Sequence, residues 1–227
     1  MTTEKIIAIG DIHGCYNTMI KILKDERLNI NFQKDKIIFL GDYIDRGNFP
    51  LKTLLALKDL QTKHPENVIC LKGNHEDMCC KYYFQGKPMW SYNGNELSRS
   101  QIDSYENMDE ILSWIKNLPL RYETDKYCFC HSGNWSLSPD NHYGLTSCLW
   151  DRDWIYYGSN NNCPKNKIMV CGHTPHRQPT YYGKDICIDT GVCYPDNGGG
   201  QLTAFLIMPD GTQTTVSVAT EKEDLRQ

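Results

Sequence analysis

Five short apolar runs in this chain each end in a turn that carries a metal-binding or acid-base side chain. Each run is four residues long and consists mainly of β-branched, aromatic or other apolar residues, which is typical of strands buried on both faces. In open α/β sheets the chemistry lies just beyond the carboxyl ends of such strands. We therefore expect the five turns to meet at one edge of the fold. The runs and their turns occupy residues 6–14, 37–47, 68–76, 127–133 and 168–174.

The turns supply six side chains with oxygen or nitrogen donor atoms and no thiolate. Asp11 and His13 are two positions apart, so both can face one ion from an extended turn. Asp42 has two carboxylate oxygens and can bridge two cations. Such donors suit a catalytic site for manganese, iron or zinc better than they suit a closed structural zinc site. The sequence therefore predicts a two-metal hydrolytic site. The predicted donors are Asp11, His13, Asp42, Asn74, His131 and His173.

Length and charge limit the class of protein. The chain has 227 residues, a formal net charge of −4 and a sequence pI near 6.0, which suit a single α/β domain without affinity for nucleic acid or anionic membrane. Its first residues do not resemble a signal peptide, and no apolar run approaches the roughly 20 residues of a membrane span. We therefore expect a cytoplasmic protein in which residues 1–219 form one domain and residues 220–227 a solvated, charged tail. The sequence leaves the oligomeric state open.

Eleven cysteines raise the question of disulfides or a zinc site. An odd number cannot pair completely, and Cys70, Cys128, Cys130 and Cys171 lie inside apolar runs where a reduced thiol packs as a small apolar group. The spacing also lacks the paired Cys-x-x-Cys pattern of zinc knuckles. We expect ordinary thiols.

The first third of the chain alternates strand and helix patterns. Parallel strands connected by right-handed helical crossovers explain this alternation. The expected strands are 6–9, 36–40 and 67–71, and the expected helices are 17–28, 51–63 and one that begins near residue 75.

The remainder is less regular. Residues 85–101 are rich in Gly, Pro, Asn and Ser, which predicts a long surface loop, and residues 109–118 form an amphipathic helix pattern. Close spacing of the later strands favours antiparallel hairpins. These strands are expected at 121–124, 127–130, 167–171, 185–188, 202–208 and 212–218. The fold class is α/β, with two sheets in a sandwich flanked by helices.

The order of the motifs resembles that of the calcineurin-like metallophosphoesterases, and most closely the bacterial and bacteriophage-type serine/threonine phosphatases of the phosphoprotein phosphatase family. The resemblance covers about residues 5–208 and includes Trp90-Ser91-Tyr92-Asn93-Gly94. It implies a four-layer arrangement with two mixed β-sheets between helices. The motifs are Gly10-Asp11-Ile12-His13-Gly14, Gly41-Asp42-Tyr43-Ile44-Asp45-Arg46-Gly47, Gly73-Asn74-His75-Glu76, His131-Ser132-Gly133 and Gly172-His173-Thr174.

The resemblance also implies a role for each residue of the site. Asp11 and His13 would bind one divalent metal ion and Asp42 would bridge to a second, which Asn74, His131 and His173 would complete. Manganese is favoured, with iron or zinc as alternatives. A hydroxide between the ions would attack phosphorus directly. The resemblance further makes Arg46 and Arg152 phosphate clamps, His75 the general acid and Asp45 its orienting partner.

Three functions remain open on the sequence. The first is hydrolysis of phosphoserine or phosphothreonine in proteins. The second is a symmetrical diadenosine tetraphosphate hydrolase, although Asp45, Arg46 and Glu76 favour the phosphatase. The third is a catalytically inactive scaffold that binds phosphoproteins, against which the complete set of donors argues. Arg152 also has a simpler interpretation as a surface residue that pairs with Asp151 or Asp153.

Overall fold

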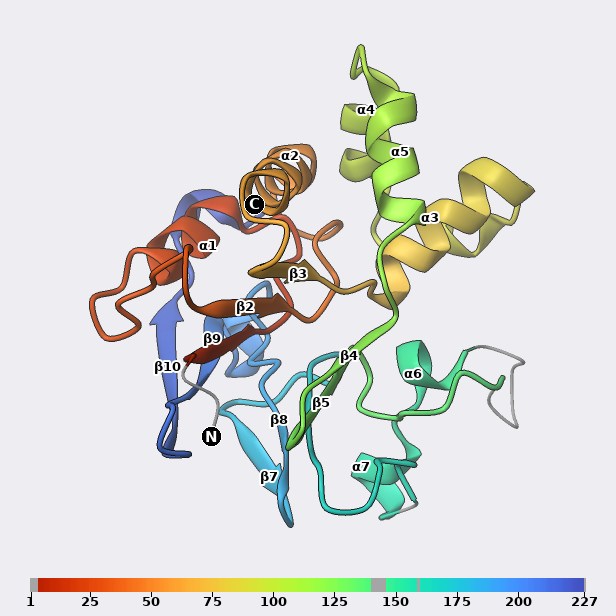
Figure 1. Cartoon of the computed structure of the whole chain (residues 1–227). Helices are drawn as coiled ribbons and strands as arrows, with labels where there is room; N and C mark the ends of the chain where they lie inside the picture. The colour runs from red at the N-terminus through yellow and green to blue at the C-terminus, as the bar shows by residue number, and fades with distance from the viewer. Residues whose placement is uncertain (1–3, 140–145, 159, 227) are drawn as a thin grey trace.

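The computed structural model describes residues 4–139, 146–158 and 160–226, and it contains two mixed five-stranded sheets with helices outside them (Figure 1). The first sheet has the order β10-β9-β1-β2-β3, with β1 Ile6–Ile9, β2 Lys36–Phe39, β3 Val68–Cys70, β9 Gln201–Ile207 and β10 Gln213–Ala219. The second has the order β4-β5-β6-β8-β7, with β4 Arg121–Glu123, β5 Tyr127–Cys130, β6 Ile168–Cys171, β7 Thr180–Tyr182 and β8 Asp185–Cys187. The α-helices are α1 Tyr16–Leu23, α2 Pro50–Lys63, α3 Asn74–Gln85, α4 Glu96–Asp103, α5 Met108–Lys116, α6 Ser147–Trp150 and α7 Asp153–Tyr157. The 3-10 helices are η1 Pro88–Tyr92, η2 Pro195–Asn197 and η3 Lys222–Asp224.

The first sheet is built on the strand-helix alternation of the first third of the chain. β1, β2 and β3 pair in parallel, as the sequence predicts, and β9 adds to β1 in the antiparallel direction. Strand alternation divides the apolar side chains of β1 between two cores. Ile7 and Ile9 pack with Met19 of α1 and Leu54 of α2.

The opposite face of the first sheet packs on the second sheet. Ile6 and Ala8 share a core with Phe129 of β5 and Val170 of β6. On the far side of the second sheet, Trp154 of α7 packs with cysteines of β6 and β8. The resulting order is helix, sheet, sheet, helix, with α1 and α2 at one end of this stack and α6 and α7 at the other (Figure 1). The predicted fold class is therefore confirmed.

Strand direction in the second half was only partly predicted. The β9–β10 hairpin is antiparallel, as expected, and Met208 and Thr212 are hydrogen-bonded across its turn. However, β5, β6 and β8 pair in parallel, because the connection from β5 to β6 contains α6 and α7, the connection from β6 to β8 contains β7, and both return the chain to the same end of the sheet. The antiparallel partners β4 and β7 lie at the two edges.

Two predicted segments are wrong in detail. Residues 85–101 are not a surface loop, because they contain η1 and most of α4, and Trp90 is fully buried against the Tyr82 and Tyr83 rings. The first helix ends at Leu23, five residues before its predicted end at Leu28. The residues after it turn back instead, and Leu28 reaches the core from that turn.

Residues 220–226 are not a solvated tail. Asp224 in η3 is fully buried, and its carboxylate accepts hydrogen bonds from the backbone N–H groups of Asn17 and Thr18, at 3.0 and 2.7 Å. These N–H groups lie in the first turn of α1, where a helix lacks internal acceptors, so Asp224 caps α1 from a distant part of the chain. Gln227 lies outside the described residues.

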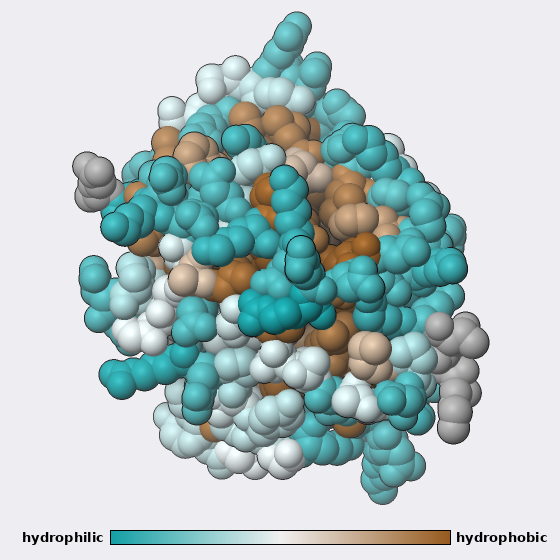
Figure 2. Space-filling view, turned by 90° about the vertical axis from the view of Figure 1, so that its left-hand side faces the viewer, coloured by the Kyte–Doolittle hydropathy of each residue, from teal (hydrophilic) through white to brown (hydrophobic). Residues whose placement is uncertain are grey.

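The surface that carries α1 and β10 is mainly hydrophilic, with hydrophobic residues visible between the polar ones (Figure 2). Between α1 and α2, the ammonium of Lys52 lies 4.1 Å from the centre of the Tyr16 ring. Among the described residues, every helix is too short or too polar to cross a membrane. All eleven cysteines are free, and nine of them are buried.

Candidate active site

The predicted donors come together around Asp42, which follows β2. The Nε2 atoms of His13 and His131 lie on opposite sides of this carboxylate, each 3.4 Å from one of its oxygens. Donor atoms of His13, Asp42 and His75 form one compact group, and those of Asp42, His131 and His173 form a second; within each group the donor atoms lie within 4.8 Å of one another. The two groups share Asp42, as expected for a carboxylate that bridges two cations.

Backbone carbonyls orient the imidazoles of both groups. The Nδ1 atoms of His13 and His131 lie 2.9 Å from the carbonyl oxygens of Ile44 and Leu40, respectively. His173 is reversed, with Nε2 3.2 Å from the Trp150 oxygen. If each of these nitrogens carries the proton, the other ring nitrogen has a free lone pair that faces the centre.

Asn74 completes the second group. Its Oδ1 lies 2.8 Å from His131 Nε2 and 3.0 Å from His173 Nδ1, and these two nitrogens are 3.1 Å apart. Three electron-pair donors therefore face the same small volume from α3 and from the ends of β5 and β6. This donor chemistry fits a divalent cation.

Asp11 lies where the two sheets meet. Its carboxylate accepts the backbone N–H of His173 at 3.1 and 3.2 Å. Burial, with the nearby carboxylates of Asp189 and Asp42, raises the pKa of Asp11 well above its ordinary value. A site that gathers buried carboxylates in this way fits a cation. The compact group around His13 nevertheless contains His75 where the sequence predicts Asp11.

The other site groups have pKa shifts that suit metal ligation. Burial lowers the pKa values of His13, His131 and His173, so these imidazoles are neutral near pH 7. Burial alone would raise the pKa of Asp42, but His131, His75, His13 and Arg46 outweigh it and lower the value. Asp42 is therefore ionised.

Several turns of the site have strained backbones. His13, Asp42, Asp45, Arg46 and His173 all have positive φ angles, between 45° and 71°. Among the described residues, only three others that are not glycine share this conformation, and all three are asparagines. Non-glycine residues with positive φ cost free energy and cluster at functional sites, so the strain is consistent with a site at these turns.

A buried chain of hydrogen bonds supports His75. Its Nδ1 lies 2.6 Å from Asp45 Oδ2, and the indole N–H of Trp90 donates to the same oxygen at 2.7 Å. The predicted partnership of His75 and Asp45 is thus present as a contact, whereas the sequence did not indicate that Trp90 touches it. The signal available was the Trp-x-x-Asn-Gly stretch, whose tryptophan belongs to η1.

Glu76 is a second residue whose part in the site was missed. Its carboxylate accepts the backbone N–H groups of Asp42, Tyr43 and Gly73 at 2.8 to 2.9 Å. It therefore joins the turn after β2 to the start of α3. Burial and the charge of Asp42 raise the pKa of Glu76 to about 7. A Cβ on Gly73 would overlap the Asp42 carboxylate, which explains the glycine.

Two guanidinium groups flank the donors. Arg46 contacts Nε2 of His13, and its guanidinium carbon lies 5.3 Å from the centre of the Tyr194 ring. Arg152 donates to the carbonyl oxygen of His173 at 3.2 Å. The two arginines therefore border different donor groups. The stacking residue Tyr194 had no signal in the sequence.

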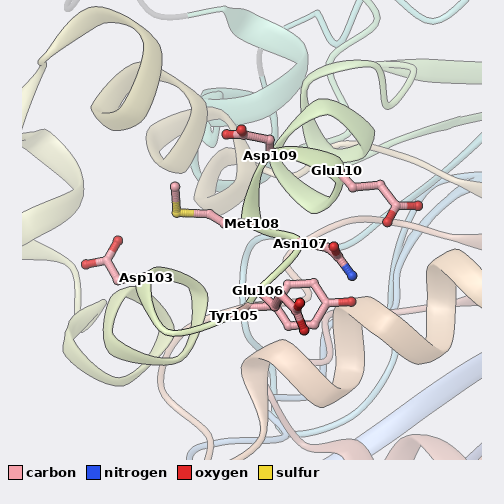
Figure 3. Close-up of a pocket in the computed structure, with 7 residues that line it drawn as sticks. All are labelled: Asp103, Tyr105, Glu106, Asn107, Met108, Asp109 and Glu110. Atoms are coloured by element: carbon pink, nitrogen blue, oxygen red, sulfur yellow. The ribbon is translucent and has the colours of Figure 1, made fainter.

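A separate hollow of about 420 Å³ lies at the connection of α4 and α5 (Figure 3). Its lining includes the acidic side chains of Asp103, Glu106, Asp109 and Glu110. Two of these already have partners, because Arg99 lies 3.4 Å from Asp103 and Lys58 lies 2.6 Å from Glu110. An acidic hollow repels phosphate, so it is not the candidate site.

The fold and the clustered donors define a metal-dependent phosphoesterase. The chain belongs to the calcineurin-like phosphoesterase family, whose sequence profile matches residues 4–198. This family binds divalent metals, in agreement with the two donor groups.

Relatives of this chain carry two kinds of activity in their names. Serine/threonine-protein phosphatase 1 of Salmonella typhimurium is 26% identical over 209 residues, which cover 86% of this chain and 88% of that protein. The asymmetrical bis(5′-nucleosyl)-tetraphosphatase PrpE of Geobacillus sp. is 27% identical over 231 residues, covering 88% and 89%. A solved protein serine/threonine phosphatase from Saccharomyces cerevisiae shares the fold, with a TM-score of 0.68, 17% identity and coverage of 98% of this chain and 82% of that one.

Proposed function

We propose that this protein hydrolyses phosphomonoesters and that its substrates are phosphoserine and phosphothreonine residues of proteins. One observation carries the proposal: two compact donor groups share the Asp42 carboxylate, and a guanidinium borders each group. A phosphate monoester needs positive charge on several sides at once, and this arrangement supplies it. The phosphatase named among the relatives gives independent support.

We assign the metal ligands as the sequence predicts, with Asp11, His13 and Asp42 for one ion and Asp42, Asn74, His131 and His173 for the other. When bound, two divalent cations would polarise the phosphoryl oxygens. They would also lower the pKa of a water molecule to a value near neutrality. Manganese is the proposed metal, with iron or zinc as alternatives, because donors of oxygen and imidazole nitrogen suit all three.

The remaining residues bind phosphate or move a proton. Arg46 and Arg152 hold the phosphoryl oxygens, since a planar guanidinium can donate two parallel hydrogen bonds. His75 donates a proton to the oxygen of the leaving serine or threonine, and Asp45 fixes the orientation of its ring through the 2.6 Å contact. This assignment predicts direct transfer to water without a phosphoenzyme.

Cleavage of a dinucleoside tetraphosphate is the second candidate. It is favoured by the likeness to PrpE, which extends over 88% of this chain. The symmetrical diadenosine tetraphosphate hydrolase considered from the sequence would act on the same class of substrate. Both candidates need the same metal centre and differ in what the protein binds beyond the cleaved phosphate.

A metal-restoration assay tests the proposal. The purified protein is depleted of metal, and manganese, iron, zinc or magnesium is then restored separately. We expect restored hydrolysis of phosphoserine and phosphothreonine peptides at a higher kcat/KM than diadenosine tetraphosphate. Preference for the dinucleotide would replace the first candidate by the second, and failure to hydrolyse even p-nitrophenyl phosphate with any metal would reject both.

The cytoplasm remains the proposed location, because eleven free thiols suit a reducing compartment. We also propose that one catalytic domain includes η3, since Asp224 contributes to the first turn of α1.

A further inference from the structure

A hollow of about 480 Å³ lies beside the proposed active site. Two loops form it. The first follows β6 and contributes Pro175, His176 and Arg177, and the second follows β8 and contributes Gly191, Tyr194 and Asn197 among others. The first loop also carries the donor His173. The hollow and the metal centre therefore share the loop that follows β6.

Tyr194 connects the two places directly. It lines the hollow, and its ring lies 5.3 Å from the guanidinium carbon of Arg46, one of the proposed phosphate clamps. Tyr194 is therefore common to the hollow and to the surroundings of Arg46.

Arg177 is the cation of this hollow that remains available to a ligand. Its side chain lies across Gly198, where an added Cβ would come within 2.8 Å of the Arg177 Nε atom. In residues 4–139, 146–158 and 160–226, the side chain of Arg177 has no ion-pair or hydrogen-bond partner, and it is exposed. His176 differs, because its ring nitrogens contact the Thr174 carbonyl at 2.6 Å and the Tyr182 hydroxyl at 2.7 Å.

The hollow has the opposite charge from the one in Figure 3. None of its seven lining residues is acidic, whereas the hollow at the α4–α5 connection contains four carboxylates. An unpaired guanidinium next to a phosphate site attracts a second anion and holds a carboxylate or phosphate with two hydrogen bonds.

We propose that this hollow binds a second anionic group of the substrate, next to the phosphate that is cleaved, and that Arg177 is the residue that selects it. The proposal rests on the proposed function. The anion has two possible sources: an acidic side chain next to a phosphoserine, or a further phosphate of a dinucleoside polyphosphate. Arg177 therefore affects substrate choice without taking part in the reaction.

The test compares Arg177→Gln with Lys184→Gln, which removes the same charge from another exposed position. The substrates are two phosphoserine peptides that differ only by Asp or Asn beside the phosphoserine, diadenosine tetraphosphate, and p-nitrophenyl phosphate, which has no second anion. We expect Arg177→Gln to lower kcat/KM by roughly three- to tenfold, mainly through KM, for at least one substrate with a second anion. The values for p-nitrophenyl phosphate and the Asn peptide should not change, and Lys184→Gln should match the original protein throughout.

The source of the anion follows from which substrate responds. A loss confined to the Asp peptide identifies a protein substrate with an acidic neighbour, and a loss confined to the dinucleotide identifies a polyphosphate. Charge reversal in Arg177→Glu should then favour a peptide with Lys beside the phosphoserine. Equilibrium binding of the two peptides, measured in a His75→Ala background, provides a readout that is independent of turnover.

Two results would overturn the subsite. One is an Arg177→Gln protein that treats all four substrates as the original does, and the other is an equal loss on all of them, p-nitrophenyl phosphate included. Hydrolysis of the phosphoserine peptides and of p-nitrophenyl phosphate by the original protein in the same experiment supports the proposed function even if the subsite fails. If the original protein hydrolyses none of the four, the proposed function itself is rejected.

Discussion

Asp42 is the residue on which both donor groups depend. It is buried, it is ionised, and its two oxygens face His13 on one side and His131 on the other. The backbone N–H of His75 also donates to its Oδ1 at 3.0 Å, which fixes the carboxylate against the start of α3. Its side chain therefore cannot turn toward one group only.

Replacement of Asp42 by Asn should weaken both metal sites together. The amide keeps the shape of the side chain but loses the negative charge and one of the two acceptor oxygens. We expect the affinity for each ion to fall at least about tenfold, which titration and metal analysis of the dialysed protein would measure. Loss of a single ion at unchanged affinity for the other would contradict bridging.

His75 has two possible roles that one variant separates. As the proposed general acid, His75→Ala should retain two ions and lose roughly 100-fold or more in kcat on phosphoserine peptides. The loss should be small on p-nitrophenyl phosphate, whose leaving group needs no proton. His64→Ala, which changes a histidine at the end of α2, is the control. A His75→Ala protein that binds one ion fewer would make His75 a ligand, in agreement with its place in the His13 group.

The sequence predicted that side chains after buried strands would come close together, because the ends of parallel strands meet, but it did not predict His75 in the place of Asp11 in the His13 group. It could not predict Trp90, Glu76 or Tyr194. Their contacts with the site depend on long-range packing or on hydrogen bonds to backbone atoms. A side chain that acts through such contacts leaves no pattern of its own in the sequence.

At the scale of elements, α1 depends on residues from the other end of the described chain. Asp224 accepts four hydrogen bonds, from the backbone and side chains of Asn17 and Thr18. The backbone N–H of Asn48 donates to the Asp224 carbonyl oxygen at 2.9 Å. Asn48 follows the turn that contains Asp45 and Arg46, so η3 supports both α1 and one side of the site.

Asp224→Ala should therefore destabilise the protein. It removes a helix cap and leaves buried N–H and hydroxyl donors unpaired, so we expect the free energy of unfolding to fall by roughly 2–4 kcal/mol. Chemical denaturation would measure the change. The matched control is Glu223→Ala, whose exposed side chain is adjacent; its effect should stay within about 0.5 kcal/mol. Equal effects of the two variants would show that the cap contributes nothing.

Trp90→Phe tests the segment that was predicted to be a loop. A smaller aromatic ring remains in the buried position, but Asp45 loses the donated N–H, so the ring of His75 is held less firmly. We expect kcat on phosphoserine peptides to fall roughly tenfold while KM, metal content and the rate with p-nitrophenyl phosphate change little. A purely structural role would instead affect both substrates to the same extent.

The elements best predicted were those with a clear apolar run or helical periodicity, such as β1, α2 and β9. The segment 85–101 was missed because its helices are short and polar outside, and a single buried tryptophan decides its position. The end of α1 was misplaced because Leu28 belongs to the core without belonging to the helix. An apolar residue at position 28 fits both a helix that continues and a turn that returns to the core, so the sequence could not distinguish the two.

At the scale of the whole molecule, the candidate site joins two sheets. Residues after β1, β2 and β3 supply one part, and residues after β5 and β6 supply His131 and His173. The sequence predicted the two sheets but not that β5, β6 and β8 are parallel. Strand direction there depends on how the long connections return, which local patterns do not encode.

Metal binding should stabilise the protein more at pH 8 than at pH 6. Burial raises the pKa values of Glu76 and Asp189 to about 7. In the metal-free protein, the contribution of the protonated Glu76 and Asp189 carboxyls to the free energy of unfolding is fully present below the ordinary pKa of a carboxyl group. This contribution is lost as the pH rises through 7. At pH 8 these carboxylates are charged and the imidazoles are neutral, so added cations are bound most strongly.

The corresponding measurement is the rise in Tm on addition of manganese at each pH. The pKa values of His13, His131 and His173 are lowered from the ordinary value of 6.5, so these three imidazoles take up protons only in more acidic solution than an ordinary histidine does. Metal should therefore be released only when the pH falls below the ordinary histidine range. An equal rise at both pH values, or a larger one at pH 6, would contradict this linkage. Asp42→Asn, with weakened sites, should show little rise at either pH.

The pairing of β1 with β9 and the cap of α1 by Asp224 have a consequence for biosynthesis. During translation, β1, β2 and β3 leave the ribosome long before the strand that flanks β1 has been made. The nascent chain therefore exposes one edge of β1 and an uncapped helix, which are the features that chaperones and aggregation act upon. An immature chain of this kind would also lack His173, one of the proposed metal ligands.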